Sequence, residues 1–114
     1  MKNQISGNYL RTHRRRAGLT QRELGVLLGY KDSGQVSRHE RSKTAPPLMT
    51  ALAYETIFHV PVSALFVGVH TSVARMIDTN VNEFETSLRI QDGKGPAAKA
   101  IAQKLEWLVT RKAK

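Results

Sequence analysis

Apolar residues recur along this chain mainly at spacings of three and four, which place them on one face of an α-helix. Capping residues and glycines divide this pattern into segments. Asn8 can cap a first helix that Gly18 ends, and Thr20 with Glu23 forms a capping box at the start of a second helix. The pattern predicts helices near 9–17, 21–28, 33–41, 47–58 and 61–67.

The second and third of these helices are separated by a short turn. The second helix carries Leu24, Leu27 and Leu28 on one face, and Gly29 suits its C-terminus because glycine tolerates positive φ. Asp32 can cap the third helix. Helix, short turn, helix is the arrangement that places its second helix in the DNA major groove.

The later part of the chain follows a different pattern. The helix predicted at 47–58 is apolar on most sides, which is typical of either a deep core or an interface. Beyond it, two apolar stripes are separated by a turn at 91–96, and they consist of Val73, Ile77, Val81, Phe84 and Leu88, then Ala97, Ile101, Leu105 and Leu108. The stripes predict a helical hairpin over residues 70–112, following a helix-turn-helix domain at 8–67. The expected fold is all-α, with a five-helix bundle followed by this hairpin.

Composition adds a strong positive charge to this picture. The 114 residues carry a formal net charge of +9. Residues 1–66 hold ten basic and four acidic side chains, so most of the charge lies on the helix-turn-helix segment. A polyanionic partner follows, although charge alone fits RNA or an acidic membrane almost as well as DNA. The chain has no cysteine, no apolar run approaching a membrane span of ~20 residues and no signal-peptide core, so we expect a cytoplasmic protein without membrane contact.

A spaced motif runs through the first three predicted helices. It reads Arg14 … Gly18-Leu19-Thr20-Gln21-x-Glu23-Leu24 … Leu28-Gly29 … Val36-Ser37-Arg38-x-Glu40, and it continues through Pro47 to Leu52 … Ile57-Phe58-x-Val60-x-Val62-x-x-Leu65-Phe66. Together these residues resemble the lambda-repressor-like family of helix-turn-helix domains (Cro/repressor, or XRE). The resemblance covers about residues 8–66, and nothing similar is recognised in residues 67–114.

The resemblance implies that the third helix, at about 33–41, reads bases in the major groove. The candidate base-reading residues at the matching positions are Ser33, Gly34, Gln35, Ser37 and Arg38. Gln35 has the donor and acceptor pair that fits an adenine edge, and Arg38 the two donors that fit guanine. The alternative for Arg38 is a contact with phosphate alone. The segment from Tyr30 to Asp32 is one residue longer than usual in the family, which leaves the reader positions open by one residue.

The same resemblance implies phosphate contacts and one structural ion pair. The candidate phosphate-binding residues are Gln21, Arg22, Arg41, Lys43 and Thr44, for which the alternative is a solvated charged face. Arg14 and Glu40 are expected to pair, tying the first helix to the third. The other first-helix arginines, Arg11, Arg15 and Arg16, are expected to face solvent or to exert a weak long-range attraction on a polyanion.

No pattern in the chain indicates catalysis. The four histidines lack metal-ligand spacing, and His39 is expected to pack against the domain. Asp92-Gly93-Lys94-Gly95 lacks the spacing and the Lys-Ser/Thr pair of a phosphate loop. We therefore expect no enzyme, no metal site and no cofactor.

The sequence favours a transcriptional regulator, a repressor that binds specific double-stranded DNA as a homodimer. The hairpin would supply the dimer contact or cover the fourth and fifth helices. The alternative is an antitoxin-type interaction module, in which the hairpin binds a toxin and the front half represses its own operon. A further alternative is a bridging coactivator that contacts proteins more than bases.

Overall fold

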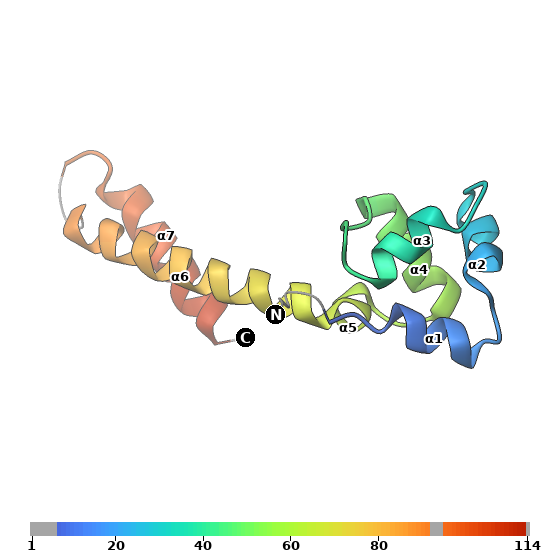
Figure 1. The fold of residues 1–114 in the computed structure, drawn as a ribbon. Coiled ribbons are helices and arrows are strands. Elements are labelled where there is room, and N and C mark those ends of the chain that lie inside the picture. Colours follow the sequence, from blue (N-terminus) through green and yellow to red (C-terminus); the bar gives the residue numbers. More distant parts are fainter. Residues whose placement is uncertain (1–6, 92–94, 114) are drawn as a thin grey trace. The chain divides into compact units, whose positions relative to one another are not determined.

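The computed structural model describes residues 7–91 and 95–113, and within them the fold is all-α, as the sequence predicts (Figure 1). The helices are α1 (Leu10–Arg16), α2 (Gln21–Leu28), α3 (Gly34–Glu40), α4 (Leu48–Phe58), α5 (Val62–Leu65), α6 (Val67–Gln91) and α7 (Ala98–Lys112). Residues 92–94, in the turn predicted at 91–96, lie outside the described part of the chain. The chain divides into two compact units, Met1–Val73 and Ala74–Lys114, with α6 running from the first into the second.

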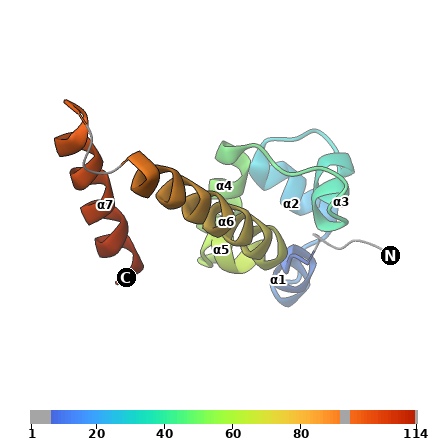
Figure 2. The same ribbon diagram turned by 90° about the vertical axis from the view of Figure 1, so that its left-hand side faces the viewer.

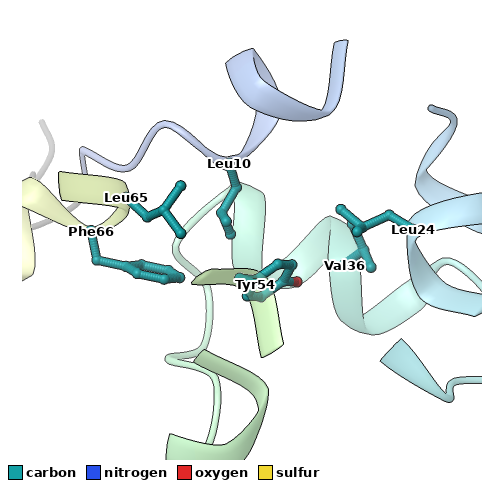
Figure 3. Close-up of a cluster of buried hydrophobic side chains, with 6 residues drawn as sticks. All are labelled: Leu10, Leu24, Val36, Tyr54, Leu65 and Phe66. Atoms are coloured by element: carbon teal, nitrogen blue, oxygen red, sulfur yellow. The ribbon is translucent and has the colours of Figure 1, made fainter. Parts of the chain in front are cut away.

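The first unit is built around one hydrophobic cluster to which each of its five short helices contributes. Figure 3 shows the side chains converging on Tyr54 of α4, and the buried members are Leu10, Leu24, Val36, Tyr54, Leu65 and Phe66. These helices are too short to be stable in isolation, so this shared burial holds them together. A backbone hydrogen bond joins the two ends of this unit: the Tyr9 N–H, just before α1, donates to the Leu65 carbonyl of α5 at 2.8 Å.

The start of α2 has the capping box that its sequence predicts. The Thr20 hydroxyl accepts from the Glu23 N–H at 3.0 Å, and the Glu23 carboxylate accepts from the Thr20 N–H at 2.9 Å. Gly29 ends the helix with φ of +91°, a conformation that glycine adopts without steric cost. The helix therefore begins and ends where its local sequence directs.

The start of α3 differs from the prediction by one residue. The N-cap is Ser33 instead of Asp32, and the helix runs over Gly34–Glu40 instead of 33–41. Asp32 still stabilises this end, because its Oδ1 accepts from the Gly34 N–H at 2.8 Å.

The packing of α2 against the turn depends on Gly25. Figure 2 shows α2 and α3 as neighbouring helices of the first unit, joined by this turn. A Cβ on Gly25 would lie 2.7 Å from the Asp32 carbonyl oxygen, closer than real Cβ contacts come. The close approach places Gly25 inside, while Leu27, predicted on the apolar face, is 58% exposed. The buried face of α2 is therefore rotated from the one that its leucines predict.

Helix α4 has both of the environments that its apolar sequence allows. Ala51 and Tyr54 are buried in the first unit, whereas Leu48, Met49 and Leu52 are exposed. The fully buried Tyr54 is in contact range of the core residues described above. One side of α4 is therefore core and the other lies open at the surface.

The second unit pairs the later part of α6 with α7. Its core consists of Leu88, Ile101 and Leu108, with Val81 and Leu105 packed against them. Glu85 joins the two helices by accepting from Lys112 Nζ at 2.9 Å, and it also accepts from Arg89 on its own helix. These hydrogen bonds to cations hold the pKa of Glu85 below its usual range. In residues 7–91 and 95–113, no helix has the length and apolar content needed to cross a membrane.

Candidate nucleic-acid interface

Helix α3 is fixed in the first unit by its inward-facing side chains. Val36 belongs to the hydrophobic cluster, and His39 is only 2% exposed. His39 Nδ1 and the Tyr54 hydroxyl are 2.8 Å apart, and the two rings meet edge to face. This burial, with a smaller contribution from the neighbouring Arg38 charge, lowers the pKa of His39. His39 is therefore packed in the core of the domain, as the sequence predicts, and its burial favours the neutral imidazole.

The C-terminal end of α3 is tied to α1 by an ion pair removed from water. Arg14 Nε donates to Glu40 Oε2 at 2.6 Å, and Arg14 Nη2 donates to Glu40 Oε1 at 3.2 Å. The same guanidinium donates to the Leu19 carbonyl, and Gln21 Nε2 donates to Glu40 Oε1 at 3.0 Å. The structure thus brings together the two residues that the sequence predicts to pair, and it adds Gln21 from α2 to the network.

A further tie comes from Asn8, for which the sequence predicted only a helix cap. Its Oδ1 accepts from the Leu10 N–H at 3.1 Å, which satisfies the start of α1. Its Nδ2 donates to the His39 carbonyl at 2.9 Å and to Ser42 Oγ at 3.1 Å. One side chain therefore joins the beginning of α1 to the end of α3, a long-range contact that no local pattern announces.

The remaining side of α3 carries the five candidate base-reading residues. Arg38 is exposed, and the others, Ser33, Gly34, Gln35 and Ser37, are partly exposed. A Cβ on Gly34 would lie 3.3 Å from Arg38 Nη2, so the guanidinium lies back along the helix over the glycine. This direction is the usual one for a helical side chain four residues later. None of the five candidates is buried in the protein core.

The candidate phosphate-binding residues lie at two places beside α3. Gln21 and Arg22 form the first turn of α2, where the opening N–H groups have no partner within the helix. Arg41, Lys43 and Thr44 follow α3 and are exposed, with Arg41 Nε donating to the Ser37 carbonyl at 3.4 Å. The Gln21 side-chain amide gives one of its two hydrogens to Glu40, which leaves the second amide hydrogen and the backbone N–H as donors toward an outside anion.

The described part of the chain, 7–91 with 95–113, contains no cluster of three or more histidine or acidic side chains able to hold a metal ion. Its first unit instead presents a helix whose inner side is anchored to α1, α2 and α4, and whose outer side is polar and flanked by cations. Such an arrangement can form directional hydrogen bonds with base edges and charge-assisted ones with phosphates.

The comparison with known protein families agrees with this geometry. Residues 7–63 match the family described as "Helix-turn-helix domain", and the match spans half of the chain. The protein belongs to this helix-turn-helix family, consistent with the lambda-repressor-like resemblance of its sequence. Membership indicates a DNA-binding regulator, a class that is typically non-enzymatic. No curated protein and no solved structure gives a significant match to the chain.

Proposed function

We propose that this protein is a transcriptional repressor that binds specific sites in double-stranded DNA by placing α3 in the major groove. The observation that carries the proposal is the division of α3 into two sides. Val36, His39 and Glu40 hold its inner side against three other helices. Its outer side is polar, partly exposed and free of these contacts. A recognition helix needs this combination, because base hydrogen bonds discriminate only when the donors are held at fixed positions.

In this proposal, base reading and backbone binding fall to different residues. Arg38 would read a guanine through two donors, and Gln35 an adenine through its amide. Ser33, Gly34 and Ser37 would lie against the neighbouring base edges, with Gly34 allowing close approach. Lys43, Thr44 and Arg41 after α3, and Gln21 and Arg22 at the start of α2, would bind phosphates and set the orientation of the domain.

We also propose that the protein binds its operator as a homodimer through the second unit. The apolar stripe on α6 is only partly covered there: Leu88 is buried, whereas Ile77 and Phe84 are 38% and 44% exposed. On α7, Trp107 is 54% exposed. Two domains related by a two-fold axis would read half-sites about 34 Å apart, one helical turn of DNA.

The test of the proposed function begins with selection of bound sites from random duplex DNA by the full chain. We expect a two-fold symmetric consensus and strong salt dependence of the affinity. Four to six phosphate contacts in each domain would contribute about −4 to −5 to the slope of log K against log salt, so a bound dimer would show about twice that slope. Recovery of no consensus, with equal affinity for every duplex, would contradict sequence-specific binding.

The selected site then separates the two proposed kinds of contact. Arg38→Ala should lose ~1–3 kcal/mol of binding free energy on that site but little on random DNA, because it removes a base contact. Lys43→Ala, the matched phosphate variant, should weaken both complexes alike and make the salt slope shallower by about one for each bound domain. If Arg38→Ala weakens binding to every duplex equally, Arg38 binds the backbone and the reader assignment is wrong.

A further inference from the structure

A hollow of about 610 Å³ opens in the first unit between α1, the start of α2 and the two ends of α3. Its charges are five arginines and a single carboxylate, that of Glu40. Glu40 is already paired with Arg14 at 2.6 Å, so the charges of these two residues cancel. The other four lining arginines, Arg11, Arg15, Arg22 and Arg41, leave the hollow with four positive charges.

These four arginines are exposed and are not used by the fold as ion-pair partners. The ion pairs within residues 7–91 and 95–113 involve Arg14, Arg89 and Lys112 as their cations. Arg11 and Arg15 are four residues apart on α1, so their side chains lie on one face and repel each other unless an anion lies between them. Arg16, next in sequence and also exposed, does not line the hollow.

We propose that the hollow is a phosphate-binding site in which Arg11 and Arg15 of α1 act together with Arg22 and Arg41. Guanidinium groups fit phosphate oxygens with paired donors, and a concave arrangement lets several of them reach one anion. Arg11 and Arg15 would thus bind an anion directly, whereas the sequence alone assigns them to solvent or to a weak long-range attraction.

The phosphate belongs to the DNA backbone, and in this respect the inference rests on the proposed function. Ser33, at the start of α3, also lines the hollow, so the site lies directly beside the proposed base-reading side. A duplex in contact with that side would bring a phosphodiester strand to the rim. Helix α1 would thereby add a third anchor to those at α2 and after α3, and would widen the footprint on one side of the groove.

Three single substitutions on α1 test this assignment, each removing one positive charge from an exposed position of the full chain. Duplex affinity is measured at several salt concentrations for Arg11→Gln, Arg15→Gln and the control Arg16→Gln. Thermal melts establish that all three are folded. We expect the slope of log K against log salt to become shallower by about 0.9 for each bound domain in Arg11→Gln and in Arg15→Gln, and to change much less in Arg16→Gln.

Equal, small changes in all three variants would overturn the inference, because α1 would then contribute only a general positive field, while the proposed function would stand. A wild-type chain that binds no duplex would instead overturn the proposed function. Tripolyphosphate serves as a probe for the alternative source of phosphate. The assignment to the DNA backbone is wrong if three results occur together: the wild type binds tripolyphosphate, Arg11→Gln loses that binding, and the duplex salt slopes are unaffected. The hollow would then be a site for a soluble polyphosphate.

Discussion

The Arg14 and Glu40 side chains are 10% and 3% exposed, so their pairing takes place almost without water. Removing one partner would leave the other as a buried, uncompensated charge. Arg14→Met and Glu40→Gln should therefore each lower the free energy of unfolding by ~3–5 kcal/mol. The pair also fixes the end of α3, so loss of DNA affinity should follow the loss of stability.

A double-mutant cycle on denaturant melts measures this pairing. The double variant should be much less destabilised than the sum of the two single variants, because neither charge then remains alone. Arg89 and Glu85 provide a control cycle, since the Arg89 side chain is 56% exposed and water screens the pair. Additive effects at Arg14 and Glu40 would mean that the two residues do not stabilise each other.

His39 gives the stability of the first unit a dependence on pH. Its pKa in the folded protein lies below the ordinary value of 6.5, because burial opposes the charged form. The unfolded chain therefore binds this proton at a higher pH than the folded one does. As the pH falls below about 6.5 toward the folded pKa, the free energy of unfolding should decrease, by up to about 1.4 kcal/mol per pH unit.

Melts at several pH values between about 7.5 and 5.5 test this dependence. His39→Gln should lose part of the pH dependence even if its stability is lower throughout, because glutamine cannot take up the proton. His70→Gln, at an exposed position, should keep the wild-type dependence. Identical pH profiles for wild type and His39→Gln would show that His39 titrates alike in the folded and unfolded states.

At the scale of elements, the local sequence predicts the helices well, because capping and spacing act within a few residues. The Thr20–Glu23 box and Gly29 set both ends of α2 as predicted. The prediction that Leu27 lies on the buried face of α2 was wrong, because α2 is rotated so that Gly25 lies against the Asp32 carbonyl. That contact depends on how the turn folds back, which helical periodicity does not encode.

The candidate site divides in the same way between local and long-range causes. The pairing of Arg14 with Glu40, across 26 residues, was expected only because the motif resembles a known family. The Asn8 contacts with His39 and Ser42 were not predicted, since an asparagine before a helix has a sufficient local explanation as a cap. The packing of α1 and α2 brings Arg11 and Arg22 to one hollow. The pattern of residues along the sequence does not predict this packing.

At the scale of the whole molecule, the second unit, which we propose as the dimerisation element, has a small hydrophobic core. Only Leu88, Ile101 and Leu108 are buried within its described residues. A two-helix layer buries little apolar surface by itself, so association of two copies would stabilise it by covering Phe84 and its exposed neighbours. The expected state of the full chain at micromolar concentration is therefore a dimer.

Sedimentation of point variants tests the dimer with the fold left intact. Phe84→Asp should give monomers, because a carboxylate would be buried in the interface, and operator affinity should fall roughly tenfold or more as the two sites become independent. Glu83→Gln, at the adjacent exposed position, should remain dimeric. A monomeric wild type would contradict the homodimer and favour the antitoxin-type alternative, in which these residues contact a different protein.

The close approach of Gly25 to the turn also limits how this sequence can diverge. Any side chain at position 25 would collide with the Asp32 carbonyl, so a replacement survives only if the turn moves away. Such a move would displace the start of α3, and with it the alignment of that helix on DNA. We therefore expect substitutions at position 25 to be accompanied by substitutions in the turn during evolution, whereas the exposed Val26 can be substituted independently.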